Sequence, residues 1–220
     1  MWRARFFTAV PKVLEAYPKG RWVFLTLTVR NCPLKELKMT LGEMNKAWKR
    51  IVERKSFPAL GFVKSVEVTR SAIGEAHPHF HVLMLVPSSY FGGHYIKQEE
   101  WREMWQSALR VDYLPVVNVK AVKPRPGEPA DTGIAIAVCE VLKYGVKEAD
   151  LMADPIWLQE LTKQLHKTRA VSVGGVLKAF INEEEPDDLI GEQDESTEEG
   201  LQIWFGWREM VKRYAKTERR

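Results

Sequence analysis

The chain has only two cysteines, Cys32 and Cys139, and they lie far apart in the sequence without the spacing of a metal-binding pair. A disulfide framework or a cysteine-rich zinc site is therefore excluded as the basis of the fold. We expect both thiols to be small packing residues in a reducing compartment.

Long apolar runs are also missing. No stretch approaches the roughly 20 consecutive apolar residues that span a bilayer, and residues 1–5, Met-Trp-Arg-Ala-Arg, lack the basic-then-apolar layout of a secretory signal. We expect a cytoplasmic protein that does not enter membranes. With 220 residues, of which 45% are hydrophobic and 28% charged, the chain is long enough for one well-buried core.

Basic residues are absent from one stretch, residues 183–199, which holds ten acidic residues. Without this stretch the chain has 33 basic and 19 acidic residues, a formal charge of +14, although the whole chain carries only +4. Such a surplus favours a polyanion, with nucleic acid as the first candidate, over a surface of interspersed charges. We predict a domain at 1–182, an acidic linker at 183–200 and an aromatic and basic segment at 201–220.

Periodic patterns predict a mixture of strands and helices. Alternation predicts strands, and apolar residues at helical spacing predict helices. The expected strands are 21–29, 61–69, 77–86 and 116–122, and the expected helices are 34–54, 97–109, one from about 131, and 155–167. A short loop joins 61–69 to 77–86, so these two strands are expected to form an antiparallel hairpin.

The strand at 77–86 carries two histidines at a spacing of two, His79 and His81. Side chains two apart on a strand point to the same face, so both imidazoles can bind one divalent ion. Two ligands alone bind weakly, and Glu67 on the neighbouring strand is the expected carboxylate ligand. His77 shares the face by parity, but it adjoins Pro78, and we expect a supporting or structural role for it.

A His-x-His pair is also found in cupin-like sites. Such a site would place a glutamate a few residues downstream, where this chain has Val-Leu-Met-Leu at 82–85. The phosphate chemistry of a histidine pair with an upstream strand glutamate is therefore the preferred interpretation.

A second group of polar residues follows at 140–147. At about 100° per residue, Glu140, Tyr144 and Lys147 share one helical stripe, away from the apolar one. A phenol beside a lysine and a carboxylate, facing a metal, has the parts for nucleophilic attack on phosphorus. The alternative is an exposed helix surface with solvated lysines, and Gly145 could end the helix and displace Lys147 from the stripe.

Three stretches in this order resemble the three motifs of HUH endonucleases: Phe-Leu-Thr-Leu-Thr at 24–28, His-Phe-His at 79–81, and Tyr-Gly-Val-Lys at 144–147. More narrowly, they resemble the single-tyrosine replication initiator (Rep) proteins of rolling-circle plasmids, over about residues 2–180. The resemblance implies an α+β fold, RRM-like, with a central antiparallel β-sheet and flanking helices. It also implies nicking and joining of DNA strands that depend on a divalent metal, Mg²⁺ or Mn²⁺.

The resemblance further implies roles for individual residues. His79, His81 and Glu67 would be the metal ligands, and Tyr144 would be the nucleophile. Glu140 would activate a water molecule. Lys143 and Lys147 would position the DNA, and Lys147 would also be catalytic. Attack by the tyrosine would leave a 5′-phosphotyrosine and a free 3′-hydroxyl. The implied partners are single-stranded DNA or an extruded hairpin at a plasmid origin, with host helicase and polymerase as further candidates.

Other functions are compatible with the same motifs. A relaxase or transposase of this superfamily would share the chemistry, and a non-catalytic DNA-binding module would share only the fold. Many plasmid initiators have a longer N-terminal region, which contains cysteines. This chain begins Met-Trp-Arg and lacks such a region. We therefore expect a trimmed catalytic domain.

Overall fold

The computed structural model describes residues 2–123, 130–142, 154–182, 204–208 and 213–217. The chain divides into two compact units, 1–185 and 186–220. In the second unit, strands β6 (Trp204–Arg208) and β7 (Arg213–Thr217) pair antiparallel. The predicted boundaries of the linker and the C-terminal segment stay a prediction.

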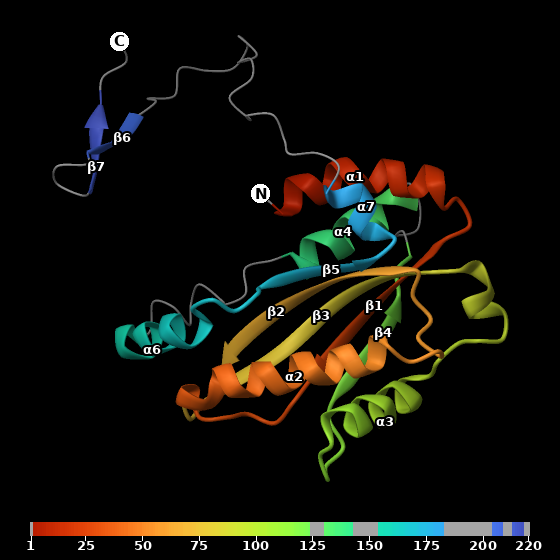
Figure 1. The fold of residues 1–220 in the computed structure, drawn as a ribbon, viewed down its shortest axis with the longest axis horizontal. Helices are drawn as coiled ribbons and strands as arrows, with labels where there is room; N and C mark the ends of the chain where they lie inside the picture. Colours follow the sequence, from red (N-terminus) through yellow and green to blue (C-terminus); the bar gives the residue numbers. More distant parts are fainter. Residues whose placement is uncertain (1, 124–129, 143–153, 183–203, 209–212, 218–220) are drawn as a thin grey trace. The chain divides into compact units, whose positions relative to one another are not determined.

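The first unit is built around a five-stranded antiparallel sheet with the order β4-β1-β3-β2-β5 (Figure 1). Its strands are β1 (Arg21–Thr28), β2 (Gly61–Arg70), β3 (Ala76–Val86), β4 (Val117–Ala121) and β5 (Val171–Gly175). The strand with the histidines, β3, is central and pairs with β1 on one side and β2 on the other. The predicted hairpin and the predicted α+β class are confirmed.

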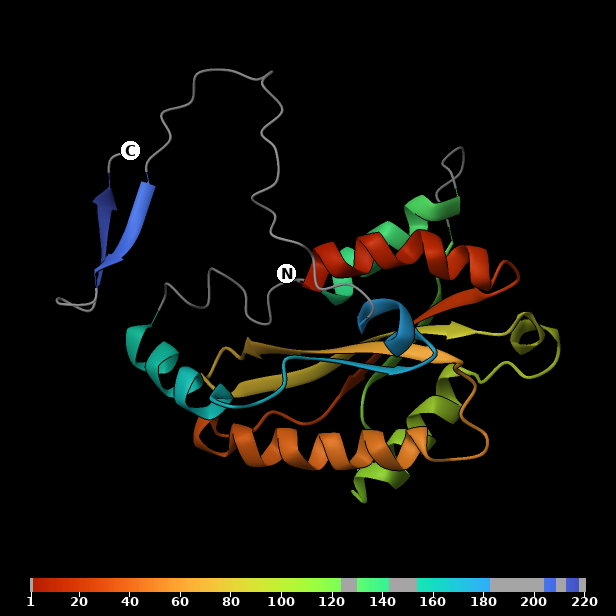
Figure 2. The ribbon, with the colours of Figure 1, turned by 45° about the horizontal axis from the view of Figure 1, so that its top comes forward.

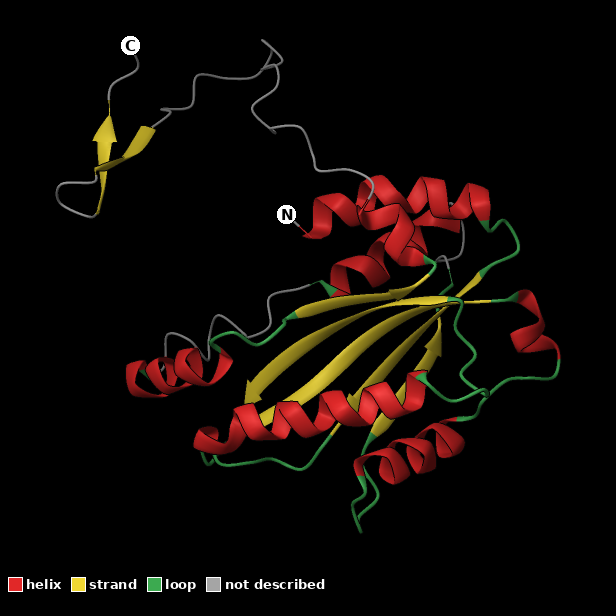
Figure 3. Ribbon diagram, in the orientation of Figure 1, coloured by secondary structure: helices red, strands yellow, loops and turns green. Residues whose placement is uncertain are grey.

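One face of the sheet packs against α2 (Leu37–Val52) and α3 (Gln98–Leu109) (Figure 3). The apolar stripe predicted for α2 is the side that the helix buries, because its members recur at helical spacing. Those members are Leu37, Leu41, Met44, Trp48 and Ile51. Helix α6 (Pro155–Leu165) adds Trp157 and Leu161 to the same core, and the 3₁₀ turns η1 (Leu34–Glu36) and η2 (Ser88–Gly92) join the layers.

The other face of the sheet packs against α1 (Trp2–Ala16), α4 (Ala130–Val141) and α7 (Leu177–Asn182). Figure 2 shows these helices on the side of the sheet opposite α2. Their apolar residues meet a sheet patch made of Trp22, Val63, Leu83 and Leu85. The sheet is thus buried on both sides, which explains why β3 is buried at nearly every position.

Three elements are absent from the sequence predictions. The sequence predicts no helix at α1 or α7 and no strand at β5, which is only five residues long and lies at the sheet edge. Gly175 in β5 has φ 61°, and a side chain there would collide with the carbonyl oxygen of Leu60. Such a short, glycine-containing edge strand has a weak sequence signature.

Within the described ranges, none of the helices combines the length and the apolar composition that crossing a bilayer requires.

Candidate active site

The face of the sheet that packs against α1, α4 and α7 also carries a polar patch, which lies next to the apolar residues that these helices cover. The strand register places Glu67 of β2 directly opposite His79 of β3, and Ser65 opposite His81. Thr26 of β1 lies opposite His81 on the other side. Because side chains alternate along each strand, all of these residues share one face of the sheet.

The three predicted metal ligands meet in this patch. Nε2 of His79 lies 2.9 Å, and Nε2 of His81 2.6 Å, from the same carboxylate oxygen, Oε2 of Glu67. Only 3% of Glu67, 9% of His79 and 7% of His81 is exposed. Buried polar groups at these distances form a defined interaction rather than a solvated surface cluster.

Each imidazole is oriented by a contact at its other nitrogen. Nδ1 of His81 lies 3.3 Å from Oγ1 of Thr26, and Nδ1 of His79 lies 3.3 Å from the carbonyl oxygen of His77. A carbonyl can only accept, so in that contact His79 carries its proton on Nδ1 and presents Nε2 as the ligand atom. Such contacts fix the tautomer and the ring orientation of metal-binding histidines.

His77 itself lies outside the triad. Its Nδ1 is 2.8 Å from Oδ1 of Asn31, and its backbone carbonyl supports His79. Burial lowers the pKa of His77, and the neighbouring His79 lowers it further. The arrangement matches the supporting role expected from the sequence.

The protonation state of His79 suits metal binding. Burial lowers its pKa below the usual 6.5, and the nearby His81 lowers it further, whereas Glu67 acts in the opposite direction. A histidine with a lowered pKa is neutral at pH 7, which is the form that binds a metal ion.

The donor set fits a divalent cation. The ligand atoms of Glu67, His79 and His81 lie within 4.8 Å of one another, close enough to share one ion whose ligands lie roughly 2 Å from it. Imidazole nitrogens bind first-row transition metals, and carboxylates bind Mg²⁺ and Mn²⁺ well. The cluster could therefore hold one divalent ion.

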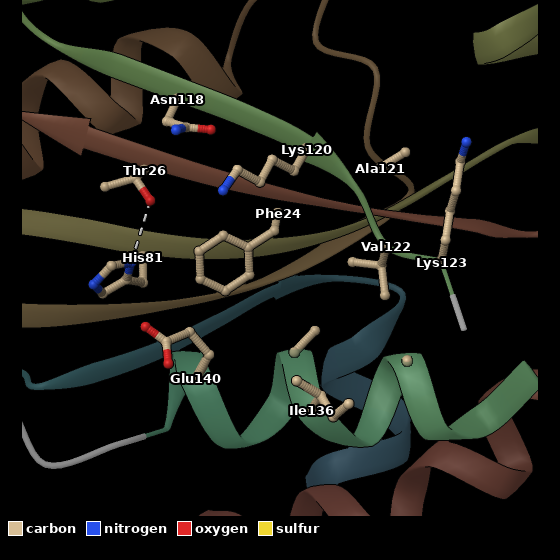
Figure 4. Close-up of a pocket in the computed structure, with 12 residues that line it drawn as sticks. Phe24, Thr26, His81, Asn118, Lys120, Ala121, Val122, Lys123, Ile136 and Glu140 are labelled. Atoms are coloured by element: carbon tan, nitrogen blue, oxygen red, sulfur yellow. Dashed lines mark hydrogen bonds between the residues drawn. The ribbon is translucent and has the colours of Figure 1, made fainter. Parts of the chain in front are cut away.

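A pocket of about 420 Å³ adjoins this cluster, between the sheet edge and α4 (Figure 4). His81 and Thr26 line it from the sheet, and Glu140 lines it from the last turn of α4. In Figure 4 the carboxylate of Glu140 points toward the side of the pocket on which His81 lies. Helix α4 therefore brings one of the predicted catalytic residues, Glu140, to the same pocket as one of the predicted metal ligands, His81.

The other predicted residues of this group, Lys143, Tyr144 and Lys147, lie outside the described residues. Their positions in the chain begin two residues after the end of α4 at Val141. Their roles, and the stripe that they were expected to share with Glu140, stay predictions.

Several residues of the site were missed by the sequence analysis. Thr26 and Phe24 lie on the face of β1 that carries His81 on β3, and the ring of Phe24 is centred 5.5 Å from that of His81. Asn118 and Lys120 come from β4. Alternation in residues 24–28 marks Thr26 as facing away from Leu25 and Leu27, but only the register with β3 shows that it faces His81.

Comparison with known proteins places the chain among replication proteins. The family described as replication protein matches residues 1–215. The chain belongs to this family. The resemblance to Rep proteins inferred from the three motifs is thereby confirmed.

Individual relatives agree with this assignment. The protein rep of Streptococcus pneumoniae is 35% identical over 219 residues, which cover 93% of this chain and 67% of that protein. The protein rep of Lactiplantibacillus plantarum is 40% identical over 208 residues, covering 86% and 65%. A replication protein of Staphylococcus aureus is 33% identical over 223 residues, covering 93% and 94%.

The chain thus spans about two thirds of the length of the first two relatives and nearly all of the third. No solved structure matches the chain significantly.

Proposed function

We propose that this Rep family member is a plasmid replication initiator that nicks and rejoins one DNA strand at an origin. The observation that carries the proposal is the meeting of Glu67, His79 and His81 at 2.6–2.9 Å, with His81 lining the same pocket as Glu140, which precedes Tyr144 by four positions in the chain. A divalent ion held by these three side chains would supply Lewis-acid polarisation of the scissile phosphodiester and would orient it.

Tyr144 is the proposed nucleophile. Its phenolic oxygen attacks the phosphorus, a bond forms between that oxygen and the 5′-phosphate, and the bond to the 3′-oxygen breaks. The phenol loses its proton in the attack, and the leaving 3′-oxygen takes one up and becomes the hydroxyl that a host polymerase extends. Because one phosphoester replaces another, the strand can be rejoined without an external energy source.

Lysines and a carboxylate complete the proposed chemistry. Lys147 offsets the charge that develops on the phosphate, and Lys143 positions the DNA backbone. Since the chain has one candidate tyrosine at this position, release of the covalent enzyme needs another nucleophile. Glu140, directed into the pocket beside His81, is suited to remove a proton from an attacking water molecule.

A phosphate of the substrate must enter this site, and this requires single-stranded DNA or an extruded hairpin. The formal +14 charge outside residues 183–199 favours binding of such a polyanion. A host helicase would supply further single strand after the first nick. Membership of the replication protein family favours an initiator over a relaxase or transposase with the same chemistry.

Relaxation of a supercoiled plasmid tests this function. With Mg²⁺ or Mn²⁺, the protein should convert supercoiled DNA that carries its origin to open circular and relaxed forms, and should leave the same plasmid with a scrambled origin intact. Salt-sensitive binding without any strand break, in all candidate origins, would instead identify a non-catalytic DNA-binding module.

A further inference from the structure

The pocket beside His81 contains more groups than the proposed chemistry of strand cleavage uses, which are only His81 and Glu140. Besides His81 and Glu140, the residues that line it form three groups: an aromatic and a hydroxyl side chain on β1, polar and basic side chains on β4 and just after it, and uncharged residues on α4. In that order they are Phe24 and Thr26; Asn118 and Lys120 on β4 with Lys123 beyond its end; and Gly133, Ile136 and Ala137. Its volume of about 420 Å³ lies within the range of small-ligand sites, about 300–1,000 Å³.

The floor of the pocket is an aromatic ring at the margin of the apolar cluster that α1, α4 and α7 cover. Phe24 is only partly buried, whereas Leu25, its neighbour on the opposite face, is completely buried. Figure 4 shows the Phe24 ring between β1 and α4, next to His81. Because Phe24 is partly exposed and lines the pocket, its ring offers a stacking surface for a nucleobase, whatever its identity.

The rim of the pocket offers hydrogen-bonding and cationic groups. Asn118 lies opposite Thr26 in the β1–β4 register, and Lys120 lies opposite Phe24. Both β4 side chains are exposed, and in Figure 4 the Lys120 chain runs over the pocket on the side of Thr26. An amide carries both donors and an acceptor for a base edge, and an ammonium group binds a phosphate.

The opposite wall leaves room for a flat ligand. Gly133 and Ala137 of α4 have small side chains, and Ile136 adds an exposed apolar surface. A planar group lying on Phe24 would therefore be covered from the helix side.

We infer that this pocket holds one base of the single strand beside the scissile phosphate, stacked on Phe24 and read along its edge by Asn118, with Lys120 on its phosphate. The inference rests on the proposed function, because the position of the scissile phosphate follows from the proposed metal ligands Glu67, His79 and His81. The pocket thereby sets the sequence preference at one nucleotide next to the cleavage site.

Binding in EDTA tests the inference separately from cleavage. Fluorescent single-stranded oligonucleotides carrying the origin, each with one abasic position, are titrated with the full chain. At one position next to the nick site the abasic change should weaken binding by wild type about 10-fold, the order expected for loss of base stacking on an aromatic ring. Phe24→Ala should bind the intact oligonucleotide with the same loss and should be insensitive to the abasic change at that position alone.

Matched variants distinguish the pocket from general DNA affinity. Phe91→Ala removes an exposed ring on η2, outside the pocket, and should keep the wild-type abasic profile. Asn118→Ala, an exposed change that does not disturb the core, should alter the base preference at the same position. Phe24→Leu keeps an apolar side chain for folding and should still lose the abasic effect.

An abasic profile that is the same in wild type, Phe24→Ala and Phe24→Leu would overturn the inference. If instead the pocket variants behave as expected but wild type cleaves no DNA with metal, the base site stands and the proposed nuclease function fails. The two ideas therefore fail separately.

Discussion

Glu67 and His81 lie on neighbouring strands and are diagonal rather than opposite in register, yet Nε2 of His81 is only 2.6 Å from Oε2 of Glu67. The residue directly opposite Glu67 is His79, whose Nε2 is 2.9 Å from the same oxygen. One carboxylate therefore reaches both imidazoles, because cross-strand and diagonal neighbours are both within side-chain reach in an antiparallel pair. A site built on two central strands is held more rigidly than one built on loops.

Removing the carboxylate should weaken metal binding. Glu67→Ala takes away the oxygen donor, and we expect the affinity for Mn²⁺, measured by isothermal titration calorimetry, to fall at least about 10-fold, as even the loss of a supporting contact costs that much. Ser65→Ala, which changes another buried polar residue on the same face of β2, is the control and should bind Mn²⁺ like wild type. Equal affinities of Glu67→Ala and wild type would exclude Glu67 as a ligand.

The contact between Thr26 and His81 gives a test of positioning. Thr26→Val removes the hydroxyl 3.3 Å from Nδ1 of His81 while keeping the shape, and should lower Mn²⁺ affinity about 10-fold. Thr28→Val is the matched change on the same strand, since the Thr28 hydroxyl donates to the carbonyl of Val116 instead. A larger loss of affinity in Thr28→Val than in Thr26→Val would contradict this role.

Glu140 is expected to act after cleavage. In Glu140→Gln the covalent enzyme–DNA species should still form, while its hydrolysis should slow by about 10²-fold or more, because a general base contributes on that order. Quenched-flow analysis of adduct formation and decay would measure both rates. Unchanged decay of the adduct would remove the proposed role, and loss of adduct formation would move Glu140 to the first step.

The buried side chain of Lys64 should make the free energy of unfolding depend on pH. It is 3% exposed, its Nζ donates to Oδ1 of Asn45 at 2.8 Å, and it lies 3.7 Å from the centre of the Phe80 ring. Burial lowers its pKa from 10.5 to about 8, and Arg169 contributes. The unfolded chain therefore holds this proton at higher pH than the folded one, so the contribution of Lys64 to stability rises between pH 8 and 10.5, by up to about 3 kcal/mol.

Urea unfolding at pH 7 and pH 9.5 measures this effect. Lys64→Met should be more stable relative to wild type at pH 7 than at pH 9.5, because the cost of burying the charge disappears from wild type as pH rises. Lys46→Met, on the exposed side of α2, should change the unfolding free energy by no more than about 0.5 kcal/mol at both pH values. A pH-independent difference for Lys64→Met would show that its pKa is not lowered.

The sequence predicts the meeting of Glu67, His79 and His81 better than it predicts the residues around them. Alternation along 61–69 and 77–86 is a local pattern, and one short hairpin is enough to align Glu67 with His79 and His81. Thr26, Phe24 and Asn118 were missed because their neighbours depend on the pairing of β1 with β3 and β4, in which these residues and their partners lie 55 to 96 positions apart in the chain. The edge strand β5 was missed because five residues with two glycines carry little strand signal.

The central claim concerns Tyr144 and is tested by one measurement. The protein is incubated with Mn²⁺ and a single-stranded oligonucleotide that spans the origin nick site, and the products are analysed by denaturing electrophoresis and mass spectrometry. We expect a covalent adduct between Tyr144 and the 5′-phosphate, together with a fragment that ends in a 3′-hydroxyl, and we expect both to be absent in EDTA and in Tyr144→Phe. Adduct formation that persists in Tyr144→Phe would contradict the account.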